Sequence, residues 1–359
     1  MKPRVLFISG REVDYIRNRV LLSALRTGFE VDTGTAVAPG TPLRMICGLL
    51  RLASRRPHYD VCFVGFYGQP LAVALSYLQR RPILLDAYVS TYDTVCQDRR
   101  WVPARSPGGR LAFWLDRHSC RRAAHVITDT RANADYFVDT FGIPKSKVST
   151  VYVGCDQALF YPRDTRAAGD APSEVFYYSS FLPLHGTDVI IEAAALLRHR
   201  CDIHFTVGGD GRGRKAAQKE IQRLGLTNIE LVGWIPLDEL PEYISQASVC
   251  LGGHFSTIPK AARVISTKTF QFIAMRRATI VGENRATREL FDPGEHVYAV
   301  PMGDPEPLAR AIRLLVDDDE LRQHIAQRGY QRFQERLTMG VLAQEVAATV
   351  ENALCGSAF

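Results

Sequence analysis

The sequence lacks any run of about 18 apolar residues, the length that a helix needs to cross a membrane. None of its eight cysteines forms a Cys-x-x-Cys pair. Several of them fall in expected buried strands or helices, which predicts reduced structural thiols, a cytoplasmic setting and no zinc site. The eight are Cys47, Cys62, Cys96, Cys120, Cys155, Cys201, Cys250 and Cys355. An expected strand at 5–9 follows Met1-Lys-Pro-Arg directly, so no signal peptide is visible.

The glycine fingerprint of a dinucleotide-binding unit is incomplete. Gly209 and Gly211 lie between an expected strand and an expected helix, but the third glycine of the fingerprint is replaced by Arg214. This departure disfavours a nicotinamide-dependent oxidoreductase. The two glycines still allow the backbone to approach a ligand closely, and a plain tight turn is the alternative.

The composition suits a protein of two domains with separate cores, because the chain has 359 residues, of which 46% are apolar and 23% charged. The charge is uneven, since residues 1–165 carry a net charge of +9 and the remainder −3. A basic first half can bind anionic lipid, a phosphorylated acceptor or nucleic acid. A solvated, arginine-rich surface is the equally weighted alternative.

Strands and helices alternate along almost the whole chain, which predicts α/β domains with parallel sheets covered by helices on both faces. In the first half we expect strands at 5–9, 30–33, 61–65, 83–86, 125–129 and 148–151, and helices at 16–27, 41–54, 71–78, 109–123 and 131–141. In the second half we expect strands at 174–180, 202–208, 229–233, 249–253, 278–281 and 297–300, and helices at 187–198, 214–224, 237–247, 305–316, 320–336 and 341–354.

A polar stretch from Pro162 to Pro172 separates the two series and is the expected linker. We predict an N-terminal Rossmann-like domain over residues 1–164 and a C-terminal one over 173–337. A last helix at 338–359 is expected to pack back on the first domain. Two doubly wound domains in tandem predict a cleft between them, faced by the carboxyl ends of the strands.

The segment from Pro259 to Met275 is the strongest candidate for a binding site. Its first part is loop-like, and its second part predicts a helix that starts at Ser266 or Thr267. Three cations lie along it: Lys260, Arg263 and Lys268. Cations and free N–H groups at a helix start, near the carboxyl ends of parallel strands, suit a diphosphate. A merely solvated helix start is the alternative.

The loop from Ser179 to Thr187 is a second candidate, because it also joins an expected strand to an expected helix. Thr187 is a natural N-cap for that helix. His185 and the N–H groups beside it can contact a phosphate. A structural loop that carries a surface histidine is the equally weighted alternative.

The two candidate segments belong to a longer series of motifs that follow one another along the chain. They are LDAYVSTYDT at 85–94 with Asp98-Arg99, SSFLPLHG at 179–186, VGGDG at 207–211, VGW at 232–234, KAARVISTKTFQFIAM at 260–275, ATIVGEN at 278–284, TREL at 287–290 and PMGDPEPLARAI at 301–312. Over essentially its whole length the sequence resembles a bacterial branch of the family 4 glycosyltransferases. The signal is strong where the C-terminal pieces combine.

The resemblance implies the GT-B fold and a nucleotide-diphosphate sugar as donor, bound mainly by the second domain. It implies hexosyl transfer, with retention at the anomeric carbon, to a sugar or lipid-linked acceptor bound by the first domain. It also implies no cofactor, no metal and no nucleic-acid partner. Our own candidates for the catalytic residues are Arg263, Lys268 and Asp86, on the grounds of charge and position given below. The implied donor contacts are Gly10, Arg11, Ser180, His185, Gly209, Trp234, Ile235, Lys260, Thr269, Gln271 and Glu289.

The departures from the family pattern concern charge. Ser180 and His185 stand where relatives commonly have the Arg and Lys that hold the diphosphate. Arg263 and Gln271 stand where relatives have the two glutamates of a Glu-x7-Glu motif. A departing nucleoside diphosphate needs fixed positive partners, which Arg263 and Lys268 can supply from the other side of the pocket. Gln271 can still hydrogen-bond a ribose diol, without charge assistance.

In the first half, Gly10-Arg11 follows the first strand, at the loop that faces the diphosphate in GT-B enzymes. Asp86 ends an expected strand, where a carboxylate can contact an acceptor hydroxyl, and an N-capping role is the alternative. The arginine-rich stretches 98–122 and 43–56 predict basic amphipathic helices that can dock at an inner membrane face. A core-facing apolar stripe with a wet basic side is the slightly favoured alternative there.

Two other functions remain open. Because both motif glutamates are replaced, the chain can be a pseudoenzyme that binds a nucleotide or a partner transferase. It can also be a GT-B enzyme of different chemistry, such as a nucleotide-sugar epimerase or hydrolase. Turnover distinguishes the first alternative from a transferase, and product identity without acceptor distinguishes the second.

Overall fold

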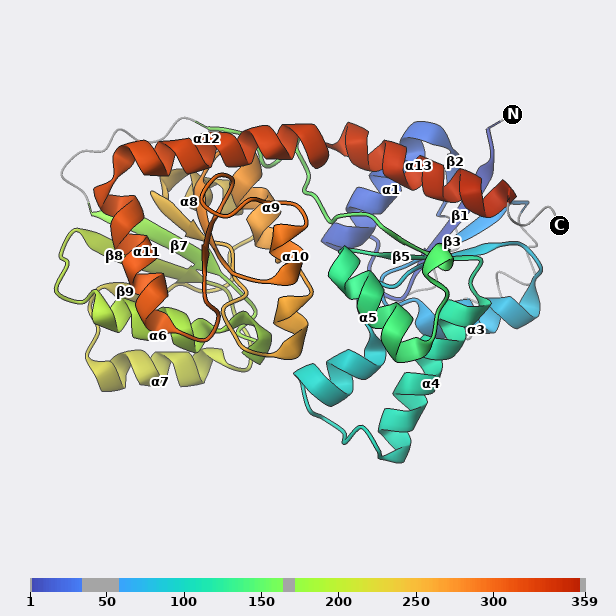
Figure 1. The fold of residues 1–359 in the computed structure, drawn as a ribbon, viewed down its shortest axis with the longest axis horizontal. Coiled ribbons are helices and arrows are strands. Elements are labelled where there is room, and N and C mark those ends of the chain that lie inside the picture. The colour runs from blue at the N-terminus through green and yellow to red at the C-terminus, as the bar shows by residue number, and fades with distance from the viewer. Residues whose placement is uncertain (1, 34–57, 164–171, 356–359) are drawn as a thin grey trace. The chain divides into compact units, whose positions relative to one another are not determined.

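A computed structural model of the protein describes residues 2–33, 58–163 and 172–355. The chain divides into two compact units (Figure 1). The first comprises Met1–Val153 and Met339–Phe359, and the second comprises Gly154–Thr338. Each unit is an α/β structure built on a six-stranded, fully parallel sheet, so the expected fold class is confirmed.

The sheet of the first unit has the strand order β2-β1-β3-β4-β5-β6. Its strands are β1 (Arg4–Ser9), β2 (Glu30–Asp32), β3 (Val61–Gly65), β4 (Ile83–Asp86), β5 (His125–Thr128) and β6 (Val148–Thr150). The central strands β3 and β4 are buried along their entire length. This explains their continuous apolar sequences, because a parallel sheet covered on both faces leaves no strand position for water.

Helices cover both faces of this sheet. They are α1 (Ile16–Gly28), α3 (Gln69–Leu78), η1 (Asp93–Asp98), α4 (Pro107–Arg122), α5 (Arg131–Phe141), η2 (Lys145–Lys147) and α13 (Met339–Cys355). The last helix of the chain, α13, packs along α1, as Figure 1 shows. The C-terminal segment therefore contributes to the core of the first unit, with Leu342, Val346 and Val350 wholly buried.

The sheet of the second unit has the strand order β12-β11-β10-β7-β8-β9. Its strands are β7 (Ser173–Tyr178), β8 (Ile203–Gly208), β9 (Ile229–Leu231), β10 (Val249–Leu251), β11 (Ala278–Gly282) and β12 (Tyr298–Val300). The chain proceeds outward from β7 in one direction and then returns to start again at β10. Neighbouring strands β7 and β10 thus form the topological switch point, where open parallel sheets bind their ligands.

Two layers of helices enclose the second sheet. They are η3 (Pro183–His185), α6 (Thr187–Leu196), α7 (Arg214–Leu224), α8 (Leu240–Gln246), η4 (Pro259–Ala262), α9 (Thr267–Ala274), α10 (Arg285–Arg288), α11 (Pro305–Asp317) and α12 (Asp319–Arg336). Val175 and Tyr177 join the core formed with α6, α7 and α11. Their neighbour Phe176 instead contacts Tyr243 of α8 and Phe272 of α9 on the other face, as strand alternation requires.

Most element boundaries differ from the expected ones by only a few residues. The largest local difference is the helix expected from residue 237, which begins at Leu240 because the preceding residues form a turn. The helix expected at 41–54 lies outside the described residues, as does most of the expected linker. The cysteines whose side chains are described are all free. None of the described helices has the length and hydropathy to cross a bilayer.

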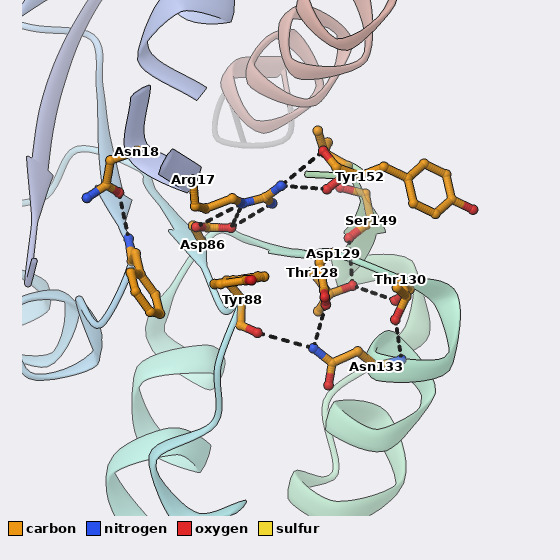
Figure 2. A network of polar contacts seen from close by, with 12 residues as sticks. Arg17, Asn18, Asp86, Tyr88, Thr128, Asp129, Thr130, Asn133, Ser149 and Tyr152 are labelled. Carbon is orange, nitrogen blue, oxygen red and sulfur yellow. Dashed lines mark hydrogen bonds and ion pairs between the residues drawn. The ribbon is translucent and has the colours of Figure 1, made fainter. Parts of the chain in front are cut away.

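A buried ion pair ties together the carboxyl ends of the first unit's strands (Figure 2). Arg17 of α1 and Asp86 at the end of β4 are both wholly buried, with 2.9 Å between Nη2 and Oδ1. Arg17 Nη1 also donates to the carbonyls of Val151 and Tyr152, which follow β6. Burial raises the pKa of Asp86, and the guanidinium opposes that shift. The Arg17 side chain thereby links α1 to the end of β4 and to the residues that follow β6.

Removing Arg17 should destabilise the first unit strongly. Arg17→Met leaves the Asp86 carboxylate buried without its partner, which costs about 3–5 kcal/mol in free energy of unfolding. Chemical denaturation measures this change, with the exposed Arg26→Met on the same helix as the matched control. Adding Asp86→Leu to Arg17→Met should recover most of the loss. If the free energy of unfolding of Arg17→Met lay within about 1 kcal/mol of the wild-type value, the structural role of the pair would be contradicted.

Candidate functional site

The switch point of the second unit brings together two loops that are distant in sequence. One follows β7 (Ser179–Gly186) and the other follows β10 (Gly252–Ser256). Ser256 Oγ donates to the carbonyl of Leu184 at 2.7 Å, and the Phe255 N–H donates to the carbonyl of His185. A Cβ at Gly186 would lie 2.5 Å from the Ser256 nitrogen, so this glycine is what allows the loops to touch. The contact places His185 against His254.

Lys268 is the central charge of this region. It lies in the first turn of α9, and only 5% of its surface is exposed. Its Nζ donates to Ser266 Oγ at 3.0 Å and lies 4.8 Å and 5.6 Å from the ring centres of Tyr177 and Tyr178. Among the described residues, no carboxylate pairs with this ammonium group. Burial therefore lowers the pKa of Lys268 to about 7. A solvated helix start is excluded for this residue.

Two imidazoles lie beside the ammonium group. The rings of His185 and His254 stack with 5.5 Å between their centres and 9° between their planes. Burial and the nearby Lys268 hold the pKa of both histidines well below the usual range. Each ring has a buried Nδ1 without a hydrogen-bond partner among the described residues. The cluster is thus rich in donors and cations and has no negative group of its own.

Gln271 and Thr269 complete the first turns of α9. Both are buried, and the Gln271 Oε1 accepts a hydrogen bond from the Tyr178 hydroxyl. Thr269 Oγ1 donates to the carbonyl of Gly252, which ties α9 to the loop after β10. Tyr178 therefore holds the side-chain amide of Gln271, for which we predict an interaction with a ribose diol. The Tyr178 ring also faces Lys268.

The glycines after β8 have a structural role in the packing of two loops. At Gly209, which has φ +116°, a Cβ would lie 1.9 Å from the carbonyl oxygen of Ser179, and at Gly211 it would lie 2.0 Å from that of Ser180. These glycines are required because the loop after β8 packs against the backbone of the loop after β7. The close approach that the structure shows is between two loops of the protein, and a donor contact at Gly209 stays a prediction.

Two expected helix caps also differ from the structure. Gly186, in a left-handed conformation, takes the N-cap position of α6, so Thr187 is its first helical residue. Ser266 does occupy the N-cap position of α9, but its side chain makes no capping bond. Its hydroxyl accepts from Lys268 instead. A contact between loops decides the cap of α6, and the Lys268 ammonium group takes the hydroxyl that would otherwise cap α9.

The remaining donor candidates lie on the loops around this cluster. Lys260 lies in η4 and Arg263 directly follows it, and both are half-buried. Ser180 and Trp234 are exposed, and 74% of the Trp234 surface faces solvent. Ile235 is buried against the end of β8, and the half-buried Glu289 follows α10. The carbonyl of Gly233 accepts from the Gly209 N–H, which holds the Trp234 loop beside the loop after β8.

The three candidates of the first unit have other contacts. Gly10 lies against the backbone of Tyr67, because a Cβ there would meet the Tyr67 oxygen at 2.0 Å. Arg11 is exposed and pairs with Glu12. Asp86 is enclosed and committed to Arg17, so the structure supports neither an exposed acceptor contact nor the capping alternative. Asp86 as an acceptor ligand stays a prediction.

Sequence reasoning did not single out His254, Tyr177 or Tyr178. The signal that identifies them is the strand order, because β10 lies next to β7 and the residues after both strands must then meet. Among the described residues, no three His, Cys, Asp or Glu side chains are grouped so as to hold a metal ion.

Family models match both halves of the chain. A model described as "Glycosyltransferase Family 4" matches residues 10–159, and one described as "Glycosyl transferase-like" matches residues 189–348. The chain is a GT-B protein related to glycosyltransferase family 4. In this GT-B protein Lys268 and His254 lie within the residues that the second model matches, and His185 lies just before them.

Curated relatives and solved structures agree with this assignment. The chain is 27% identical, over 253 residues, to the alpha-D-kanosaminyltransferase of Streptomyces kanamyceticus, covering 67% of this chain and 61% of that protein. It is 22% identical, over 242 residues, to the MMP alpha-(1->4)-mannosyltransferase of Mycolicibacterium hassiacum, covering 67% and 57%. The matches thus span about six-tenths of these relatives.

Two solved structures share the fold over nearly the whole chain. The Anabaena protein HepE, solved in complex with UDP, matches with a TM-score of 0.75 at 17% identity, covering 97% of this chain and 100% of that one. Sucrose-phosphate synthase from Thermosynechococcus elongatus matches with a TM-score of 0.77 at 14% identity, covering 98% and 99%. At these identities the likeness establishes the GT-B fold.

Replacing Lys268 with an apolar residue of similar length should stabilise the ligand-free protein. Lys268→Met removes a buried ammonium group that lacks a carboxylate partner, and we expect about 1–4 kcal/mol more free energy of unfolding near neutral pH. Denaturant unfolding monitored by circular dichroism measures the change, and Lys219→Met on the exposed face of α7 is the matched control.

The same pair of proteins gives a test by pH. The folded pKa of Lys268, about 7, lies below its unfolded value of 10.5. Between these values the unfolded chain binds more protons, so wild-type stability should rise with pH across this window. The rise should be smaller in Lys268→Met. The expectation would be contradicted if Lys268→Met were less stable than wild type and its stability changed with pH in the same way. That result would show that the folded protein already stabilises the ammonium group.

Proposed function

We propose that the protein transfers a hexose from a nucleotide-diphosphate sugar to an acceptor hydroxyl, with retention at the anomeric carbon. One observation carries the proposal. The switch point of the second unit places a buried ammonium group, two stacked imidazoles and the start of α9 around one region that has no internal counter-charge among the described residues. A diphosphate supplies the missing negative charge, and donors at a strand–helix junction suit its oxygens.

The substituted motif residues fit this role in a changed form. Lys268 meets the diphosphate as a buried point charge, and Arg263 and Lys260 add charge from the neighbouring η4. His185 and His254 donate hydrogen bonds in place of the cations that relatives carry in the loop after β7. Gln271, held by Tyr178, faces the ribose as a neutral partner.

The proposed reaction is a front-face transfer. The bond between the anomeric carbon and the diphosphate oxygen breaks, and a bond to the acceptor oxygen forms on the same face. The acceptor proton passes to the departing phosphate, so no separate enzymatic base is needed. Lys268 and Arg263 stabilise the negative charge that develops on the leaving group, which is where fixed cations accelerate a reaction most. No metal takes part in this scheme.

The relatives support the donor class. HepE was solved in complex with UDP and with UDP-glucose, and it shares the fold over nearly the full chain. The relatives named for kanosaminyl and mannosyl transfer act on sugars. We take UDP-sugars as the first donors to test, and a sugar or a lipid-linked sugar as the acceptor class.

Removing either cation should slow transfer sharply. Lys268→Ala and Arg263→Ala each lose a charge facing the leaving group, and we expect a fall of about 10²–10³ in kcat. The measurement is nucleoside diphosphate release from a panel of UDP-, GDP-, ADP- and dTDP-sugars, with and without simple glycoside acceptors. Lys219→Ala is the charge-matched control and should behave as wild type.

The same assay separates the alternatives. Near wild-type rates for both variants would contradict the assigned roles of the two cations. Absence of turnover by the folded wild-type protein with every donor would favour a pseudoenzyme. A free sugar or an epimerised nucleotide sugar as the main product, with acceptor present, would identify a hydrolase or an epimerase.

A further inference from the structure

The outer face of α4 and the end of α3 form an exposed apolar patch on the first unit. Of the large hydrophobic side chains in this region, Trp101, Leu111 and Trp114 are 56%, 64% and 48% exposed. Tyr77 and Leu78 at the end of α3 are exposed to a similar degree. The two helices pack against each other, as Figure 1 shows, so the exposed residues of α3 and α4 belong to one surface. Trp101 lies in the loop that leads into α4.

Ring stacking makes this surface continuous from α4 to α3. Leu111, Trp114 and His118 follow one another at spacings of three and four residues, which places them on one side of the helix. The ring of His118 stacks on Trp114 at 4.8 Å and on Tyr77 at 6.0 Å. Arg122 then lies over the Tyr77 ring at 4.7 Å. The side chains of Trp114, His118, Tyr77 and Arg122 therefore form one continuous stack on this surface.

The opposite side of α4 is the one that packs on the protein. Its buried positions are Gly109, Ala112, Asp116, Ser119 and Cys120, all small or internally bonded. Phe113 also packs inward, against Tyr92 and Phe141. Leu111 and Trp114 instead point away from the core. The helix has the core-facing side and the wet basic side of the alternative from sequence, and in addition Leu111 and Trp114 lie exposed on its outer side.

In the segments that form the patch, the exposed charged side chains are arginines. Residues 69–85 and 99–122 contain a single carboxylate, that of Asp116. Asp116 is buried and accepts hydrogen bonds from Ser90 and from the N–H groups of Thr91 and Tyr92. The exposed arginines of the same segments are Arg80, Arg81, Arg100, Arg105, Arg110, Arg117, Arg121 and Arg122.

We propose that this face, formed by the end of α3, α4 and the loop before it, docks on the surface of an anionic membrane. Tryptophan, tyrosine and leucine side chains enter the boundary between headgroups and acyl chains, and arginines around them pair with lipid phosphates. Exposed leucines favour lipid over nucleic acid, because a nucleic acid offers phosphates and stacking bases but no aliphatic phase. The surface is independent of the donor site in the second unit.

The probe is a set of vesicles of phosphatidylglycerol and phosphatidylcholine in equal parts, compared with vesicles of phosphatidylcholine alone. The full-length protein should co-sediment with the anionic vesicles at low ionic strength and not with the neutral ones. The chain has three tryptophans. In a Trp234→Phe background the emission of Trp101 and Trp114 should shift to the blue and be quenched by brominated lipid.

Variants identify the face that binds. The double variant Leu111→Ser/Trp114→Ser should lower vesicle partitioning at least about tenfold. Arg110→Gln and Arg117→Gln should each lower it roughly fivefold. The controls are Arg26→Gln, an exposed arginine on α1, and Leu196→Ser, an exposed leucine of the second unit. All variants should keep the wild-type far-ultraviolet circular dichroism.

Three results would overturn the proposal. One is the absence of binding to anionic vesicles at low ionic strength by the folded protein. Another is binding that the apolar and arginine variants leave unchanged. The third is tighter binding to an oligonucleotide than to vesicles, with the arginine variants impaired and Leu111→Ser/Trp114→Ser unaffected, which would assign the face to nucleic acid.

Discussion

The ammonium group of Lys268 is the constraint around which the second unit is arranged. It is buried at the start of α9, between two tyrosine rings and near two imidazoles, with no carboxylate partner among the described residues. Such an arrangement costs stability in the free protein and is favourable once an anion is bound. The first unit also contains a buried cation, Arg17, but this guanidinium forms an ion pair with Asp86. One buried cation is therefore structural, and the other is available for a ligand.

The fold follows largely from local sequence patterns. Continuous apolar runs such as those of β3 and β4 predict buried parallel strands, and their alternation with helices predicts two doubly wound sheets. The cations of the segment 260–268 are also recognisable from sequence as a candidate site, which stays a prediction. Local patterns do not show which strands are neighbours in a sheet. His254 meets His185 only because β10 lies beside β7, and the sequences of the two loops carry no sign of that pairing.

Local preferences were misleading where loops pack against each other. Thr187 is an ordinary capping residue by type, yet Gly186 takes the cap position because only a glycine fits against Phe255 and Ser256. The glycines at 209 and 211 lie against the loop after β7, a contact that their own sequence does not indicate. Asp86 has the position of an acceptor contact in the sheet, and its environment is set by Arg17, sixty-nine residues earlier in the chain. Each of these outcomes depends on a non-local neighbour.

The most direct test of the account is a calorimetric titration of the wild-type protein with UDP, and then with GDP, ADP and dTDP, with and without magnesium. At about pH 8 Lys268 is mostly neutral in the free protein, because burial lowers its pKa to about 7. Binding of a diphosphate should restore its charge, so the account predicts binding of at least one nucleotide, indifferent to magnesium, with uptake of close to one proton. The uptake is seen as a binding enthalpy that changes with the ionisation enthalpy of the buffer, and it should vanish in Lys268→Met. A folded protein that binds none of the four nucleotides would contradict the central claim.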